Sequence, residues 1–166
     1  MRVVVIADTH VRASTAGGRV LPGAVYRDLR RADVILHAGD VCTAGVLAEL
    51  GQWAPVRAVL GNNDGTDVAA LGVRETLELE LDGLRVGMIH DSGPAAGRAV
   101  RMRRRFPAAE LVVFGHSHIP WDETVNGQRC FNPGSPTDRR RQPHGTMGEL
   151  LIADGELVDA RIVAVS

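Results

Sequence analysis

Short apolar runs, many of them β-branched, alternate with helix-like stretches through the first two-thirds of the chain. The runs occupy residues 2–7, 34–38, 56–60 and 111–115. Continuous apolar runs of this length are typical of strands buried on both faces. Residues 22–32 begin with Pro22, residues 43–53 begin with Thr43 as the expected helix cap, and both stretches carry apolar residues at helical spacing. This alternation predicts a layered α/β domain.

The rest of the chain alternates apolar and polar residues around short polar turns. The turns Asp82-Gly83, Asn126-Gly127 and Asp154-Gly155 lie within residues 76–90, 121–132 and 149–165. Asn-Gly and Asp-Gly are the residues that two-residue hairpin loops require. Parallel β/α units joined to antiparallel hairpins imply one mixed sheet, or two sheets that face each other. No repeat or linker interrupts the pattern, so we expect one domain over residues 1–166.

Composition narrows the class of protein. The 166 residues are 45% hydrophobic and 23% charged, which is typical of a soluble globular domain with one core. The formal net charge of −1 provides no global field to attract nucleic acid or an anionic membrane. Cys42 and Cys130 form no CxxC pair, so we expect buried thiols in a reducing compartment. With no signal-like start and no apolar stretch of roughly 20 residues, a cytoplasmic protein without a membrane partner is expected.

Polar residues that can bind metals follow five of the expected strands. They are Asp8, His10, Asp40, Asn62 or Asn63, His90, His116 and His118. Chemistry in open α/β sheets collects at the carboxyl ends of strands, so these side chains are expected to meet. Taken singly, Asp40 would be read as a helix cap and His90 as a core histidine. The HxH spacing at 116–118 is more specific, because alternate residues of an extended segment share one side.

The combination of imidazole, carboxylate and amide oxygen suits Mn²⁺, Fe²⁺, Zn²⁺ or a similar divalent ion. Seven ligands are more than one tetrahedral zinc uses. They match two ions that share a bridging carboxylate, at a separation of about 3.5–4 Å. Such a pair holds both the attacking and the leaving oxygen in phosphoryl transfer.

The strand-end motifs also resemble those of a known family. DTH (8–10), GD (39–40), GNND (61–64), His90 and GHSH (115–118) resemble the metal-binding motifs of calcineurin-like metallophosphoesterases, in order and approximate spacing. NPGS (132–135) and the short chain are similar to the small bacterial and archaeal phosphodiesterase branch of that superfamily. The resemblance implies an α-β-β-α sandwich of two mixed sheets flanked by helices.

The resemblance further implies two metal ions and a reaction. Asp8, His10 and His118 would hold the first ion, Asp40 would bridge, and Asn62, His90 and His116 would hold the second. Mn²⁺ is the expected metal, with Zn²⁺, Fe²⁺ and Ni²⁺ as alternatives. The implied activity is hydrolysis of a small-molecule phosphoester, above all a phosphodiester, by in-line attack of a hydroxide shared by the ions.

Two positions depart from the family pattern. Many relatives have a histidine where this chain has Asn63, and that histidine contacts the phosphate. An amide can donate a hydrogen bond to a phosphoryl oxygen but has no useful pKa for general acid catalysis. We therefore expect Asn63 to be a catalytic contact and the substrates to have good leaving groups. Asp91 replaces a common glycine and is expected to start a turn, with orientation of an imidazole as the alternative.

The remaining charged residues are expected to be structural or to lie at the rim of the site. His37 is expected to be structural, His144 to be an exposed loop residue and Asp64 to shape its loop. The arginines of residues 98–105 are expected to form the solvated face of a helix that ends near Phe106. One rim arginine is expected to steer a phosphate. The candidates are Arg12, Arg139, Arg140 and Arg141.

Two other functions stay open. The chain resembles a retromer subunit of eukaryotes that serves as a scaffold, so fold alone does not establish catalysis. No expected ligand position is vacated here, which favours an enzyme. A metal-dependent nuclease would need a long basic groove, and only local arginine clusters occur, so nucleic acid is not the expected partner. Small relatives often form homo-oligomers, which leaves a homo-oligomer as an alternative to a monomer.

Overall fold

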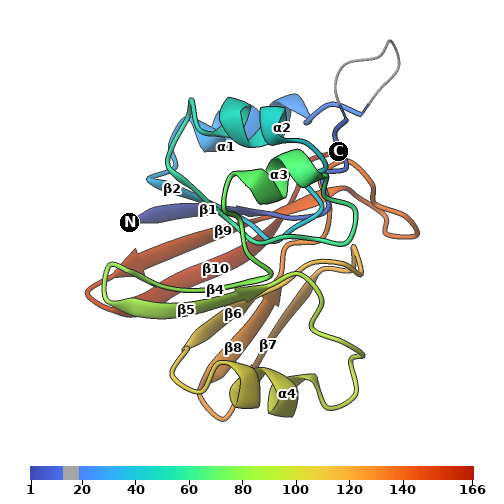
Figure 1. The fold of residues 1–166 in the computed structure, drawn as a ribbon. Coiled ribbons are helices and arrows are strands. Elements are labelled where there is room, and N and C mark those ends of the chain that lie inside the picture. Colours follow the sequence, from blue (N-terminus) through green and yellow to red (C-terminus); the bar gives the residue numbers. More distant parts are fainter. Residues whose placement is uncertain (13–18) are drawn as a thin grey trace.

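Two five-stranded mixed sheets form the centre of the computed structural model, which describes residues 1–12 and 19–166 (Figure 1). The first sheet has the order β10-β9-β1-β2-β3, and the second has the order β4-β5-β6-β8-β7. The first comprises β1 (Arg2–Ile6), β2 (Val34–His37), β3 (Val56–Ala58), β9 (Thr146–Ala153) and β10 (Glu156–Ala164). The second comprises β4 (Thr76–Leu81), β5 (Leu84–Ile89), β6 (Leu111–Val113), β7 (Trp121–Val125) and β8 (Gln128–Asn132).

Helices cover the outer face of each sheet. α1 (Gly23–Leu29), α2 (Ala44–Leu50) and α3 (Thr66–Ala70) lie on one side of the molecule, and α4 (Arg98–Arg105) lies on the other (Figure 1). The α-β-β-α sandwich expected from the motifs is therefore confirmed. No helix in the described ranges is long and apolar enough to cross a membrane.

The two-sided burial of β1 explains its continuous apolar run. Val3 and Val5 belong to the core between the sheets, where they join residues such as Met88 from the second sheet. Val4 and Ile6 point the other way, into the core that the first sheet forms with α1 and α2. Because successive side chains of a strand face opposite sides, both faces of β1 must be apolar.

The three expected hairpins are present, and their turns have the backbone that the residues predict. Asp82, Asn126 and Asp154 have φ angles of 49°, 50° and 51°, and each is followed by a glycine that also has positive φ. This is the conformation of a type I′ turn, which needs positive φ at both central residues. The helix α3 was not predicted, because five residues are too few to show a helical period.

The arginine-rich helix differs from expectation at its first residue. Arg98 is buried, with 7% of its surface exposed, whereas a solvated side chain was expected. Its guanidinium lies 4.8 Å from the centre of the Phe114 ring and 4.5 Å from that of Trp121, and its Nε donates to Ser92 Oγ. Burial of the stem and stacking on two rings replace the contacts with water.

Parallel pairing aligns the strand ends that carry the motifs. β1 pairs in parallel with β2, and β2 with β3, in the first sheet. β5 pairs in parallel with β6 in the second sheet. The carboxyl ends of these strands therefore gather at one end of the sandwich, where their following loops meet.

Candidate metal centre

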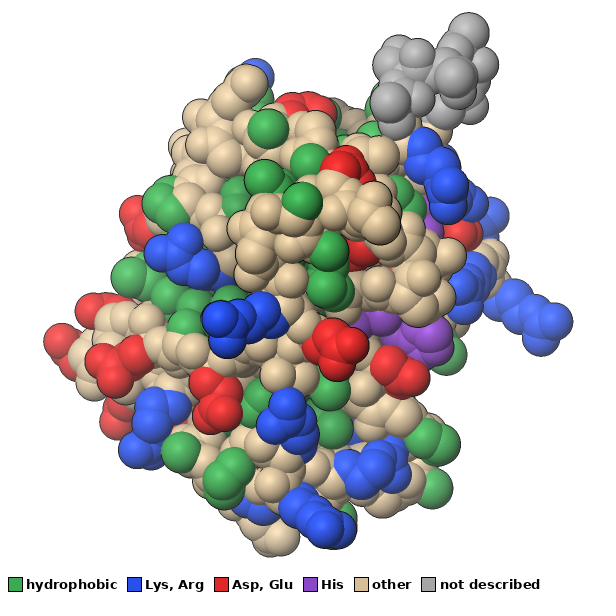
Figure 2. All heavy atoms as spheres, viewed as in Figure 1, with side chains coloured by type: hydrophobic (Ala, Val, Ile, Leu, Met, Phe, Trp, Pro, Cys, Tyr) green, Lys and Arg blue, Asp and Glu red, His purple; other side chains and the backbone are tan. Residues whose placement is uncertain are grey.

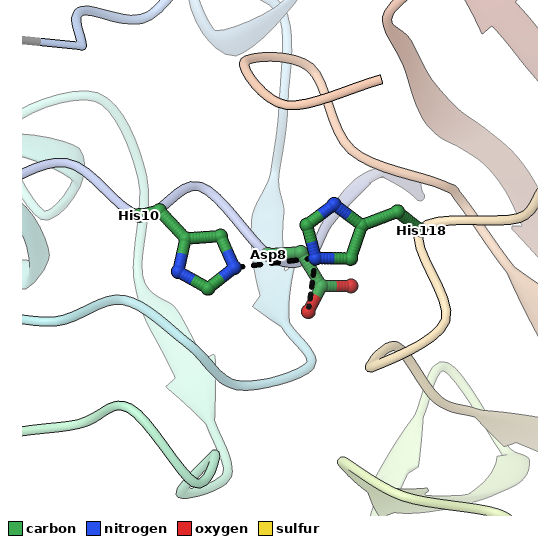
Figure 3. A group of neighbouring side chains, drawn as sticks. All are labelled: Asp8, His10 and His118. Carbon is green, nitrogen blue, oxygen red and sulfur yellow. Dashed lines mark hydrogen bonds and ion pairs between the residues drawn. The ribbon is translucent and has the colours of Figure 1, made fainter. Parts of the chain in front are cut away.

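The loops after β1 and β6 bring three candidate ligands together. Asp8, His10 and His118 point toward one another, with ligand atoms all within 4.8 Å (Figure 3). His10 Nε2 lies 3.2 Å from His118 Nε2, and His118 Nε2 lies 3.6 Å from Asp8 Oδ1. Two ring nitrogens and a carboxylate oxygen that converge in this way can hold a divalent ion.

A second group adjoins the first through Asp40. Asp40 Oδ2 lies 3.5 Å from His10 Nε2 and 3.5 Å from His90 Nε2, so this carboxylate stands between the two groups. Asn62 Oδ1 lies 3.1 Å from His90 Nε2 and 3.1 Å from His116 Nδ1. All seven candidate ligands are thus brought together, and the carboxylate expected to bridge has the intermediate position.

The backbone at these ligands is unusual. Five of the seven have positive φ, although none is a glycine. They are Asp8 (54°), His10 (46°), Asp40 (57°), His116 (67°) and His118 (59°). Each such residue costs roughly 1–2 kcal/mol and persists only where its surroundings determine it. This concentration of strain at one end of the sandwich is typical of a functional site.

The glycines that precede the ligands allow a close approach of the loops. A Cβ at Gly61 would lie 2.2 Å from both the backbone nitrogen and Oδ1 of Asp40. A Cβ at Gly115 would lie 2.9 Å from Asp8 Oδ2. Real Cβ atoms do not approach backbone and carboxylate atoms this closely, so each motif needs its glycine for steric reasons.

Backbone carbonyls orient two of the histidines for metal binding. His90 Nδ1 donates to Ala38 O at 2.7 Å, and His118 Nδ1 donates to Asp138 O at 2.6 Å. Because a carbonyl only accepts, the proton lies on Nδ1 and the lone pair of Nε2 faces the carboxylates. Both rings therefore have the tautomer that a metal ligand requires.

The NPGS motif supports the loops that carry the ligands. Asn132 Nδ2 donates to Gly115 O at 2.8 Å, and Ser135 Oγ donates to Asp8 O at 2.7 Å. The sequence pattern did not single out Asp138, and it predicted Cys42 only as a buried thiol. Cys42 is buried, and its Sγ lies 3.8 Å from His10 Nδ1, so the thiol contacts the ring of a candidate ligand.

The electrostatics of the carboxylates show that the site fits a cation. Burial raises the pKa of Asp8 to about 7. Burial also opposes ionisation of Asp40, but the nearby His90 ring and the hydrogen bonds from Asn63 hold the pKa of Asp40 well below the usual range. Asp8 Oδ2 is buried and has no hydrogen-bond partner among the described residues. A buried carboxylate oxygen without a partner is costly, and a divalent ion would satisfy it.

Comparison with known families identifies the superfamily of the chain. A family model described as the calcineurin-like phosphoesterase superfamily domain matches residues 1–155. The chain belongs to the calcineurin-like phosphoesterase superfamily. The resemblance of its motifs to those of metallophosphoesterases is therefore confirmed. This superfamily comprises phosphoester hydrolases that use divalent metals, and the metal of this chain stays a prediction.

Proteins similar to this chain include archaeal members of the superfamily. A probable metallophosphoesterase of Methanothermobacter thermautotrophicus is 35% identical over 169 residues, which cover 98% of this chain and 92% of the relative. Vps29 from Entamoeba histolytica complexed with Zn²⁺ has a TM-score of 0.78 at 24% identity, with both chains covered in full. An archaeal phosphodiesterase has a TM-score of 0.72 at 19% identity and 99% coverage of both chains. These two structures are similar in fold alone.

Asn63, the residue that departs from the family pattern, contacts Asp40. Its backbone nitrogen donates to Asp40 Oδ1 at 2.8 Å, and its side-chain Nδ2 donates to Asp40 Oδ2 at 2.7 Å. Asn63 thus holds both carboxylate oxygens of Asp40 in place, one through its backbone nitrogen and one through its side-chain nitrogen. Asp64 closes the same loop, since it accepts hydrogen bonds from Cys42 N and Gly61 N, both at 2.7 Å.

The other candidates lie as expected from the sequence. Asp91 Oδ1 accepts a hydrogen bond from Gly93 N at 2.7 Å, which forms a turn. His37 is fully buried beside Thr9, and burial lowers its pKa to about 3, so it is a neutral core residue. His144 is exposed in its loop.

One rim arginine has a clear electrostatic connection to the site. Burial is the largest influence on both pKa values, and it raises that of Asp8 and lowers that of His10. The positive charge of Arg140 is a smaller influence that lowers both pKa values. Arg139 instead donates to Gln142 O within its own loop. Among the four rim candidates, Arg140 is the one whose positive charge influences the pKa of the ligand groups Asp8 and His10.

Proposed function

We propose that the protein is a metal-dependent phosphodiesterase that acts on small-molecule phosphodiesters. The observation that carries this proposal is the intermediate position of Asp40, 3.5 Å from a histidine of each ligand group. One carboxylate between two sets of nitrogen and oxygen donors is the arrangement of a two-metal hydrolase. The similarity in fold to an archaeal phosphodiesterase supports the preference for diesters.

The residues of the chain have separable tasks in such a reaction. Two divalent ions, Mn²⁺ by preference, would supply Lewis acidity and lower the pKa of the attacking water. Asp40 would hold the two ion sites at a fixed separation, and Asn63 keeps both of its oxygens in place. Arg140 would balance the negative charge of the phosphate from the side of Asp8 and His10. Asn63 itself could not act as the general acid that a histidine at this position would provide.

Metal titration tests the proposal directly. Protein stripped with a chelator is expected to bind two equivalents of Mn²⁺, to unfold at a higher temperature as Mn²⁺ is added, and to regain hydrolysis of bis(p-nitrophenyl) phosphate. Calorimetry, thermal unfolding and release of p-nitrophenolate measure the three effects. A protein that binds Mn²⁺, Zn²⁺, Fe²⁺ and Ni²⁺ without hydrolysing any phosphoester would instead support the scaffold function.

The presence of Asn63 in place of a histidine leads to a prediction about which leaving groups the protein tolerates. Wild type is expected to hydrolyse aryl phosphodiesters at least about 100-fold faster than alkyl ones, because an alkoxide needs a proton to depart and an amide cannot supply it. Asn63→His is expected to narrow this ratio. Asn63→Ala loses the hydrogen bond to Asp40 without adding an acid, so it is expected to slow both esters alike. Equal wild-type rates on aryl and alkyl esters would contradict the prediction.

A further inference from the structure

A groove leads away from one side of the metal centre. It has a volume of about 500 Å³, and Asn62, His90 and His116 form its inner end. Its walls come from the start of β4 and the end of β5, with apolar surface from Leu60 and Ile89. This is the side of the second ligand group, so a substituent on a phosphate bound at the metals would enter here.

A second cavity of about 470 Å³ continues this groove toward α4. The two share Ile89, Asp91 and Arg105 in their walls, so they adjoin along the end of β5 and the last turn of the helix. Figure 2 shows acidic side chains beside the histidine surface and basic side chains farther along, over α4. We call the two adjoining cavities together the β5–α4 groove.

Charges change sign along the β5–α4 groove. Next to the metal centre, Glu75 and Asp91 supply two exposed carboxylates. Arg104 and Arg105 lie in the walls of the outer part, both exposed. Glu75 thus lines only the inner part and Arg104 only the outer part, whereas Asp91 and Arg105 line both parts.

The arginines of α4 are not equivalent. Arg101 donates to the carbonyls of Ser92, Pro94 and Ala96, so its donors are used within the wall. Arg105 donates one hydrogen bond, from Nη2 to Thr76 Oγ1 at 2.9 Å, which orients its guanidinium and leaves its other donors free of described partners. The side chain of Arg104 makes no hydrogen bond or ion pair with another described residue. Two guanidinium groups therefore remain to bind an anion.

We infer that the β5–α4 groove selects phosphodiesters that carry a second phosphate, joined to the first by a spacer with hydroxyl or amino groups. This inference rests on the proposed phosphodiesterase activity of the metal centre. The spacer would donate hydrogen bonds to Glu75 and Asp91, whose negative charge repels a phosphate placed next to them. The second phosphate therefore fits best away from Glu75, where Arg105 and Arg104 bind it in the bidentate manner that guanidinium groups favour.

The groove also limits the size of the substrate. The groove runs from the end of one strand to the end of one helix. The net charge of the protein is −1. A mononucleotide-sized molecule fits this description, with one reacting phosphate, a ribose and base, and one terminal phosphate. Long nucleic acid would need a basic surface beyond the groove.

A pair of chromogenic esters tests the inference. Adenosine 5′-(p-nitrophenyl phosphate) and the same ester with an added 3′-phosphate are compared by release of p-nitrophenolate from the Mn²⁺-loaded protein. Water adds to phosphorus and the bond to the aryl oxygen breaks in both cases, so only the second phosphate differs. Wild type is expected to show a kcat/KM about tenfold higher for the 3′-phosphorylated ester, through KM, since charge-assisted hydrogen bonds contribute this much.

Substitution of the two arginines completes the test. The double variant Arg104→Ala, Arg105→Ala is expected to reduce the kcat/KM ratio of the two esters to about one. Arg57→Ala, which removes an exposed arginine of β3 that does not line the groove, is expected to keep the tenfold ratio.

Each failure has a separate meaning. If neither ester is hydrolysed, the proposed phosphodiesterase function is wrong. If both esters are hydrolysed with equal kcat/KM, or if the double variant keeps the wild-type ratio, the inference about the second phosphate is wrong while the activity stands. Faster cleavage of a long single-stranded oligonucleotide than of the 3′-phosphorylated ester would overturn the small-substrate assignment in favour of a nuclease.

Discussion

Asp40→Asn is expected to lower kcat/KM for phosphodiester hydrolysis by about 10³-fold or more, a loss of roughly 4 kcal/mol of transition-state stabilisation. Asp40 Oδ2 is the atom that lies 3.5 Å from a histidine of each ligand group. An asparagine has the same shape but no charge, and its amide nitrogen cannot bind a cation. Both ion sites would lose their shared ligand through one substitution.

Metal binding gives this prediction a readout besides activity. Wild type is expected to unfold at a higher temperature when Mn²⁺ is added, and Asp40→Asn is expected to lose most of that increase. Calorimetric titration should show weaker Mn²⁺ binding and fewer than two equivalents bound. If the variant keeps wild-type activity with two bound ions, Asp40 is not the bridging group.

Asp67→Asn is the matched control for charge and shape. Asp67 Oδ2 accepts a hydrogen bond from Ala44 N at 2.7 Å, so this carboxylate caps α2 and lies outside the metal centre. We expect the control to lose about 1 kcal/mol of stability or less and to keep its metal binding and its kcat/KM. A general effect of removing one negative charge would lower the activity of both variants equally.

Much of this centre could be predicted from the sequence because its ligands are tied to strand ends. Asp8, Asp40 and His90 each follow an apolar run closely, and parallel pairing brings such positions together whatever the details of packing. The hairpin turns were predictable for a similar reason, since Asp-Gly and Asn-Gly specify the turn locally. A local signal thus determined both features.

The features that the pattern did not predict depend on contacts between distant segments. Thr43 was expected to cap α2, but its side chain makes no capping hydrogen bond, and Asp67 caps the helix from across the fold. Arg98 was expected to be solvated, and only the meeting of Phe114 and Trp121 over α4 explains its burial. The contact between Asn63 and Asp40 likewise joins two loops, so no spacing within either loop indicated it.

Gly61→Ala is expected to disrupt the centre by steric means alone. A Cβ at this position would lie 2.2 Å from the nitrogen and from Oδ1 of Asp40. Neither is the end of a flexible chain, since one is backbone and the other is held by Asn63. The loops must therefore move apart, at a cost of about 1–3 kcal/mol for overpacking, which would lower Tm by several degrees.

The same movement should also lower the activity of the protein that remains folded. A displacement of about 1 Å in a catalytic group can reduce the rate about 100-fold, so Gly61→Ala is expected to lose at least that much in kcat/KM. Weaker Mn²⁺ binding should accompany the loss, because Asp40 is the group displaced. Thermal unfolding, Mn²⁺ titration and release of p-nitrophenolate on the same preparation separate these effects.

Gly45→Ala, at a glycine of α2, is expected to have the opposite effect on stability and no effect on activity. A Cβ there meets no atom within 4 Å, and the residue is exposed within the helix. Alanine is favoured over glycine in a helix by roughly 0.5–1 kcal/mol, so this variant is expected to be slightly more stable and fully active. If both glycine variants keep wild-type activity, the loops after β2 and β3 tolerate separation, and the close approach of Gly61 to Asp40 is not required for the chemistry.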